Sequence, residues 1–216
     1  MNQDNNNSRW WQIWFKIKQP PAEKGVAYPF NDLIIAHRIL QPIINNYNQK
    51  LDSWHFHRRW KNDETGHLFN FFIKSEEMVK DTIFDEIEES KTLKILKDNG
   101  LVQETGCYEK LPNQNGLYVW GEWPQSINRN FPLFVHSLSK LWLDMIDEIQ
   151  NFVPTKSLDP ENIDQLQVFY QQIEANLNNE WLYRGAQFTY HYVSGIFGYS
   201  PTLISPDKMR GFLMAL

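Results

Sequence analysis

The sequence predicts an α+β fold, in which an antiparallel sheet packs against several helices and the C-terminal half is mostly helical. Strand-like alternation of apolar and polar residues lies in the first third of the chain and includes a hairpin pattern between residues 54 and 73. Apolar residues at helical spacing dominate the chain after residue 130. Because strands lead and helices follow, the order favours α+β over an alternating α/β fold.

Composition limits the class of protein. The chain has 216 residues, 15% of them aromatic, and a formal net charge of −5. High aromatic content argues against disorder, and the acidic balance argues against a nucleic-acid-binding protein. The single cysteine, Cys107, excludes an internal disulfide framework and fits a reducing cytosol. The start lacks the pattern of a signal peptide, and no stretch is apolar enough to span a membrane. We therefore expect a cytoplasmic protein with a disordered tail at 1–8 and a single domain over 9–216.

The first expected elements are a strand and a helix. Apolar residues alternate with polar ones over 11–17, which predicts a strand with one apolar face. Asn31 or Asp32 then caps a helix whose apolar stripe runs from Leu33 to Tyr47. Pro42 is expected to bend or break that helix near its middle.

Residues 54–60 and 67–73 predict a hairpin around a polar loop. A register symmetric about that loop makes four pairs, which are Trp60 with His67, Arg58 with Phe69, Phe56 with Phe71 and Trp54 with Ile73. A slip of one residue would exchange the two faces, so the register is a working hypothesis.

The rest of the chain reads mainly as helices. Ser75 is the expected cap of a helix ending near Glu89, and a shorter helix ends at Asn99-Gly100. Residues 103–130 are rich in Gly, Pro and Asn and predict a long aromatic loop region. Three further helices are expected, around 134–149, from Asp159-Pro160 to Leu177, and over 181–197.

The predicted hairpin concentrates basic side chains. The run 54–60 holds His55, His57, Arg58 and Arg59, and His67 begins the second strand. Two histidines at i and i+2 point the same way from a strand, but the sequence supplies no third ligand motif, so we expect no metal. Planar cations suit a carboxylate or phosphate. A solvated strand face with ordinary surface charges is the competing interpretation.

Two further groups are candidates. Arg184, Gln187 and His191 share one helix face, where His191 could transfer protons and Arg184 could hold an anion. A partly exposed polar stripe explains the same spacing. Trp120 and Trp123 in the aromatic loop could contact an extended peptide, or could form a satellite hydrophobic cluster.

The order of these segments resembles the thiopeptide-type bacteriocin biosynthesis domain. That family includes the glutamate-elimination domain of lanthipeptide dehydratases and the stand-alone pyridine synthases of thiopeptide pathways. The resemblance rests on segments spread over nearly the whole chain, namely Phe56-His57-Arg58-Arg59-Trp60, Asp63, Gly66-His67-Leu68, Cys107-Tyr108-Glu109, Gly121-Glu122, Val135-His136-Ser137, and Thr189-Tyr190-His191-Tyr192 through Ile196-Phe197-Gly198.

The resemblance matches Arg59 and His67 to family positions, and it departs from the family elsewhere. Phe69 and Phe71 stand where the family has arginines, and His191 is offset by one residue from a family histidine, whose positions hold Tyr190 and Tyr192. One residue on a helix is a rotation of about 100°.

The resemblance implies a stand-alone enzyme of ribosomal-peptide natural-product biosynthesis. It would act on a modified precursor peptide by glutamate elimination or by cycloaddition-type ring closure, without a cofactor. Its implied catalytic residues are His191, Tyr192, Arg59 and His67, and its implied substrate-binding residues are His57, Arg184, Trp120 and Trp123. The implied partners are the precursor peptide and a glutamylating dehydratase, with a homodimer left open. A non-catalytic adaptor that binds a leader peptide or a partner enzyme is the alternative.

Overall fold

The computed structural model of the chain describes residues 7–18, 30–58, 67–109, 125–154, 159, 161–185 and 196. Contacts within the chain cluster into two units, residues 1–174 and 175–216, and the division falls inside the last long helix. The prediction of one domain over 9–216 stays a prediction. The predicted tail at 1–8 lies outside the described residues except for its last two positions.

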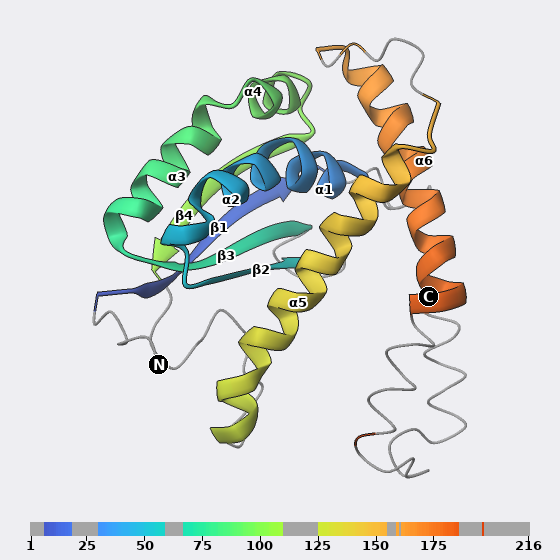
Figure 1. Cartoon of the computed structure of the whole chain (residues 1–216). Helices are drawn as coiled ribbons and strands as arrows, with labels where there is room; N and C mark the ends of the chain where they lie inside the picture. The colour runs from blue at the N-terminus through green and yellow to red at the C-terminus, as the bar shows by residue number, and fades with distance from the viewer. Residues whose placement is uncertain are drawn as a thin grey trace. The chain divides into compact units, whose positions relative to one another are not determined.

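Four antiparallel strands form one sheet. They are β1 (Arg9–Ile17), β2 (Ser53–Arg58), β3 (Leu68–Ser75) and β4 (Val102–Glu109), in the spatial order β2-β3-β1-β4 (Figure 1). The predicted α+β class is confirmed. The predicted hairpin is β2–β3, and three of its four predicted pairs are present, which are Trp54 with Ile73, Phe56 with Phe71 and Arg58 with Phe69. The fourth pair involves Trp60, which lies outside the described residues.

The prediction of a loop over 103–130 is wrong at its start, because residues up to Glu109 belong to the strand β4. It pairs with β1 so that Ile13 lies opposite Cys107 and Trp14 opposite Gly106. A Cβ atom at Gly106 would lie 2.5 Å from the Trp14 ring, so glycine is required where the indole crosses the neighbouring backbone. A glycine inside a strand weakens the alternating pattern, and tertiary packing here overrides the low strand propensity.

The first helical segment runs unbroken through Pro42. It consists of α1 (Phe30–Ile34), a π-helical segment η2 (Ile35–Leu40), α2 (Gln41–Tyr47) and the short 3₁₀ turn η3 (Asn48–Lys50). Pro42 is the second residue of α2, and its missing backbone N–H lies where the π-helical segment η2 passes into the α-helix. Asn31 and Asp32, predicted as caps, instead lie inside α1 and are buried.

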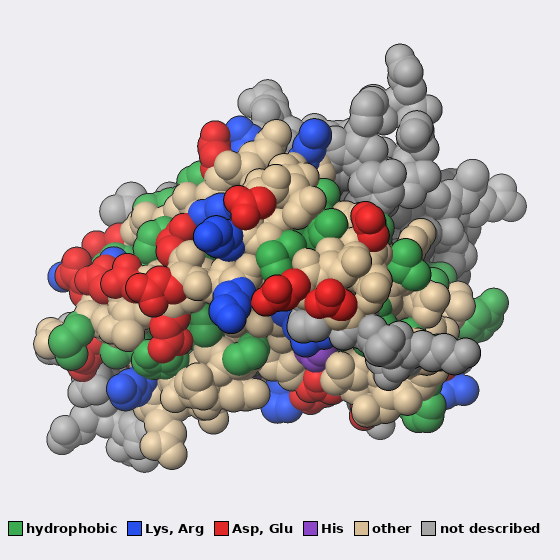
Figure 2. Space-filling view, turned by 90° about the horizontal axis from the view of Figure 1, so that it is seen from above, with side chains coloured by type: hydrophobic (Ala, Val, Ile, Leu, Met, Phe, Trp, Pro, Cys, Tyr) green, Lys and Arg blue, Asp and Glu red, His purple; other side chains and the backbone are tan. Residues whose placement is uncertain are grey.

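The helices α3 (Glu77–Glu89) and α4 (Lys91–Asp98) follow β3. Ser75 ends β3, Glu76 holds the N-cap position of α3, and Ser90 caps α4 by accepting from the Leu93 N–H. The predicted stop at Gly100 is confirmed by its φ of 67°. Acidic side chains gather over α3, on the left of Figure 2, and the exposed ones between β3 and α4 are Glu76, Glu77, Asp81, Asp85, Glu86, Glu88 and Glu89.

Two longer helices, α5 (Gln125–Gln150) and α6 (Ile163–Glu180), are followed by the π-helical turn η5 (Trp181–Gly185). The helix expected to reach Leu177 is present as α6, and its apolar residues Leu166, Tyr170 and Ile173 are buried. The helix begins later than Asp159-Pro160 predicts, since the Asn162 side chain accepts from the Gln165 N–H at 3.1 Å. Of the expected helix over 181–197, most of the part after 185 lies outside the described residues.

The helix α5 covers the outer edge of β2. The Ser139 hydroxyl accepts from the Phe56 N–H at 2.9 Å, and Nδ1 of His136 donates to the Trp54 carbonyl at 2.7 Å. Side chains of α5 thus satisfy backbone groups that would otherwise expose a sheet edge. The other edge of the sheet is β4.

The main core lies on one face of the sheet. Ile13 and Phe15 of β1 meet Phe69 and Phe71 of β3, all fully buried, and α1–α2 runs across the sheet in Figure 1. Trp142 of α5 adds its ring to Phe56 and Phe69. Within the described residues, none of the helices has the length and apolar character needed to cross a membrane.

Candidate active site

A fully buried carboxylate, Asp32, is the centre of the candidate site. Its Oδ2 lies 2.5 Å from Nε of Arg58, and its Oδ1 and Oδ2 lie 2.8 and 3.0 Å from Nε2 of His67. His67 is 5% exposed, whereas the Arg58 side chain is 35% exposed. The Asp32 carboxylate therefore receives two donors, which offset much of the cost of burying its charge.

The fold explains why these three residues meet. Arg58 ends β2 and His67 immediately precedes β3, so the hairpin brings both to the same end of the sheet. Asp32 lies in the first turn of α1, where the helix dipole favours a negative charge. Nε2 of His67 donates its hydrogen to the Asp32 carboxylate, so in the neutral ring Nδ1 is an acceptor.

A second carboxyl group joins from α6. Glu174 is 9% exposed, and its pKa is raised to about 7, chiefly by burial and also by the charge of Asp32. The Arg58 guanidinium and a hydrogen bond from the Phe30 backbone N–H oppose that rise. Asp32, Arg58, His67 and Glu174 are called the Asp32 cluster below.

The Asp32 cluster combines the parts of an acid–base site. Glu174 changes its protonation state near neutral pH, where a general acid or base works best. His67 is oriented by a carboxylate, an arrangement that fixes its tautomer. The Arg58 guanidinium lies 5.5 Å from the Trp142 ring centroid, which holds the cation at the rim of the site. Among the described residues, histidine, cysteine and carboxylate side chains form no group able to hold a metal ion.

A second polar network joins α6 to η2 and α5, one turn of α6 away from Glu174. The Tyr170 hydroxyl is 2.5 Å from Nδ1 of His37 and 3.1 Å from Nε of Arg38. Nε2 of His37 lies 3.0 Å from Oδ1 of Asp147, whose other oxygen accepts from Gln41 at 2.5 Å. Burial lowers the pKa of His37 against the effect of Asp147, and burial raises the pKa of Tyr170 to about 12. Tyr170, His37, Arg38 and Asp147 are called the Tyr170 anchor below.

The opposite face of the sheet carries a buried amide network. Gln12 donates to Asn70 at 2.6 Å and accepts from the Tyr108 hydroxyl at 2.7 Å. His55 is buried on this face and stacks on Phe72 with ring centroids 4.8 Å apart. The network fixes the pairing of β1, β3 and β4 from the side away from the main core.

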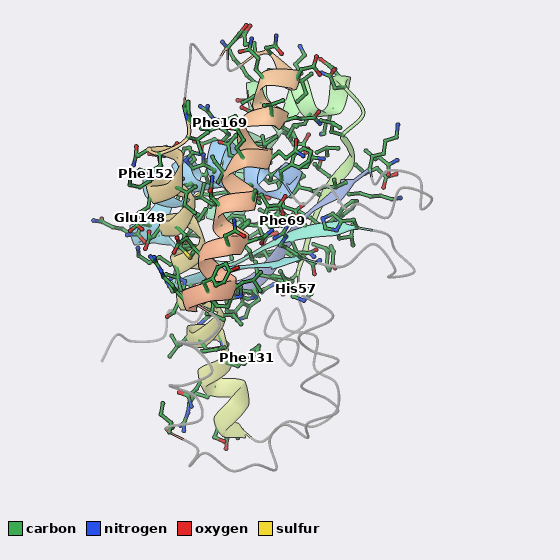
Figure 3. All side chains as sticks on the ribbon, turned by 90° about the vertical axis from the view of Figure 1, so that its right-hand side faces the viewer. His57, Phe69, Phe131, Glu148, Phe152 and Phe169 are labelled. Carbon is green, nitrogen blue, oxygen red and sulfur yellow. The ribbon has the colours of Figure 1, made fainter. Side chains whose placement is uncertain are left out.

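The structure places some of the sequence-predicted site residues together and others apart. His67 belongs to the Asp32 cluster. His57 is exposed near the end of β2 (Figure 3), on the sheet face opposite Arg58, because successive side chains of a strand alternate. Arg184 lies in η5, 81% exposed, and pairs with Glu180 at 3.1 Å.

The other predicted site residues lie outside the described residues, and their roles stay predictions. They are Arg59, Trp120, Trp123, His191 and Tyr192.

The sequence interpretation missed Asp32 and Glu174 as functional residues. The sequence predicts Asp32 to be a helix cap, because an Asp at the start of an apolar stripe is the usual signal for a cap. Glu174 follows Tyr170 by four residues and therefore lies on the apolar stripe of α6. An acidic residue inside a buried stripe is the signal that could have identified it.

Comparison of the chain with protein-family models, with curated proteins and with solved structures gives no match.

Proposed function

We propose that the chain is a stand-alone enzyme of ribosomal-peptide natural-product biosynthesis that uses the Asp32 cluster for acid–base chemistry on a modified precursor peptide. One observation carries the proposal. His67, bound to the buried carboxylate of Asp32, lies in a cluster with Glu174, a carboxyl group whose pKa is raised to about 7. Perturbed groups of this kind gather at functional sites more often than elsewhere.

The family resemblance supports the choice of reaction. His67 is among the residues that the resemblance matches to family positions, and it belongs to the Asp32 cluster. Arg59, which the resemblance also matches, follows Arg58 directly in the sequence. Glutamate elimination and ring closure both act on a peptide, and elimination is the one that requires a base.

The elimination would proceed in balanced steps. The ionised carboxylate of Glu174 takes the α-proton of a glutamylated serine or threonine, the Cα–H electron pair forms the alkene, and the Cβ–O bond breaks. The glutamyl group leaves as a carboxylate, to which the doubly protonated form of His67 would donate from Nδ1 while its Nε2 stays bonded to Asp32. The substrate enters at Arg58, the most exposed member of the cluster. Ring closure would rely instead on holding two alkenes together.

The proposal includes partners and a compartment. A glutamylating dehydratase supplies the modified precursor, so the chain works in the cytoplasm beside it. The protein binds the precursor peptide rather than nucleic acid, and it uses no cofactor.

Mass spectrometry of a glutamylated precursor peptide tests the proposal. The wild-type chain is expected to remove glutamate and leave a dehydrated residue, and Glu174→Gln is expected to slow this about a hundredfold or more, the usual range for a lost general base. Glu148→Gln, a change of the same kind at an exposed position of α5 (Figure 3), is the matched control. An unchanged peptide mass with the wild-type chain overturns the elimination, and equal rates for both variants overturn the site.

The non-catalytic adaptor is the second candidate, and the sheet edges favour it. The edge of β2 is covered by Ser139 and His136 of α5, whereas the described residues pair β4 only with β1. An extended peptide could add to β4 as a further strand. Hydrogen exchange with the precursor peptide present tests this. Protection across 103–109 without a change in peptide mass supports the adaptor, and unaltered exchange there excludes it.

A further inference from the structure

The Tyr170 hydroxyl is held from two sides. Arg38 can only donate, so its Nε–H points to the hydroxyl oxygen, and the hydroxyl hydrogen is left for Nδ1 of His37. His37 then carries its own hydrogen on Nε2 and donates it to Asp147. This neutral tautomer gives each of these hydrogens an acceptor, so the hydroxyl has one favoured position.

The Tyr170 anchor ties three helical segments to one another. His37 and Arg38 are adjacent in the π-helical segment η2, Asp147 belongs to α5, and Tyr170 belongs to α6. Single π-helical turns are frequent at functional sites. Tyr170 is fully buried, so its hydroxyl serves the protein's own side chains rather than a substrate.

The anchor lies one helical turn from the Asp32 cluster. Tyr170 and Glu174 are four residues apart on α6 and therefore share one face of it. Both meet the same helical segment, Tyr170 through His37 and Arg38, and Glu174 through the backbone N–H of Phe30. Any sliding or rotation of α6 at Tyr170 would move the Glu174 carboxyl by a similar amount.

We infer that Tyr170 is a positioning residue for Glu174, fixing the register of α6 against α1 and η2 so that the Glu174 carboxyl stays buried beside Asp32 and Arg58. The inference rests on the proposed function only in treating Glu174 as a catalytic group. The placement of Glu174 can be tested without any substrate.

Loss of the hydroxyl has a defined consequence. In Tyr170→Phe the ring still fills its space, but the part-buried Nδ1 of His37 and Nε of Arg38 lose a partner. The helix α6 then loosens at this turn, and water reaches Glu174. Since burial is the largest cause of the raised pKa of Glu174, that pKa falls.

Carboxyl-carbon NMR titration of the full chain measures this directly. The wild-type Glu174 is expected to titrate near 7, and in Tyr170→Phe its midpoint is expected to move toward the ordinary value of 4.5. Tyr47→Phe is the matched control, because Tyr47 donates its hydroxyl at 2.9 Å to Glu86 in an exposed pair. The Glu174 midpoint in that variant should stay at the wild-type value.

Arg38→Lys serves if Tyr170→Phe does not fold, since it keeps the charge and removes the Nε donor. A smaller shift of the Glu174 midpoint in the same direction is expected. A Glu174 midpoint that stays near 7 in the folded variant overturns the positioning role and leaves the proposed function standing. A wild-type midpoint near 4.5 overturns the acid–base role of Glu174 and this inference with it. If the wild-type chain does not turn over the precursor peptide but the Glu174 midpoint shifts in Tyr170→Phe, the proposed enzymatic function is overturned and the positioning role of Tyr170 stands.

Discussion

Replacing Glu174 with glutamine should remove a pH dependence of stability that the wild-type chain carries. The pKa of Glu174 is about 7 in the folded chain against an ordinary value of 4.5. A carboxyl group with a raised folded pKa stabilises the fold below the unfolded pKa, and this contribution is lost as the pH rises through the folded pKa. Glutamine is neutral at every pH and so keeps the favourable state of the group.

The difference between 4.5 and about 7 corresponds to roughly 3 kcal/mol of folding free energy as an upper value. Urea unfolding followed by tryptophan fluorescence at about pH 5 and about pH 8 measures the change in each protein. From the lower to the higher pH, the free energy of unfolding of the wild-type chain and of the Glu148→Gln control should fall by up to that amount more than that of Glu174→Gln. Identical pH dependence in all three proteins would refute the burial of the Glu174 carboxyl.

Three further changes test the surrounding structure by urea unfolding. Arg58→Ala leaves the buried Asp32 carboxylate with one donor fewer and should destabilise the fold by roughly 3 kcal/mol, while an effect near zero would show that the ion pair is solvated. Gly106→Ala forces a methyl group against the Trp14 ring and should cost about 1–3 kcal/mol, and wild-type stability would contradict the close approach. Ser139→Ala leaves the Phe56 backbone N–H of β2 without its acceptor and should lower the free energy of unfolding by about 1 kcal/mol. An unchanged stability would show that water reaches this N–H and that α5 does not cover the edge.

The hairpin could be predicted because its signals are local. Alternation over Trp54, Phe56 and Arg58 repeats in the next strand, and the polar loop between them leaves one symmetric register. The strand β4 could not be predicted in the same way. Gly106 breaks the alternating pattern, and the reason for that glycine is the Trp14 ring, which lies 92 positions earlier in the sequence.

The candidate site divides in a similar way. His67 and Arg58 stand out in the sequence because basic residues concentrate on one hairpin. The carboxylates that give them a role come from helices, and the Asp32 contacts join residues 26 and 35 positions apart. No local pattern encodes those pairings. Glu174 carries a weak local signal, an acid inside an apolar stripe, which gains meaning only when the partner helix is known.

The pH profile of glutamate elimination tests the central claim most directly. With the glutamylated precursor peptide as substrate, the wild-type rate is expected to rise with pH through a midpoint near 7, as the Glu174 carboxyl ionises. The Glu148→Gln variant should keep that limb, and Glu174→Gln should lose it. If Glu174→Gln showed the same rise of rate with pH and an undiminished rate, the assignment of the Asp32 cluster as the acid–base site would be contradicted.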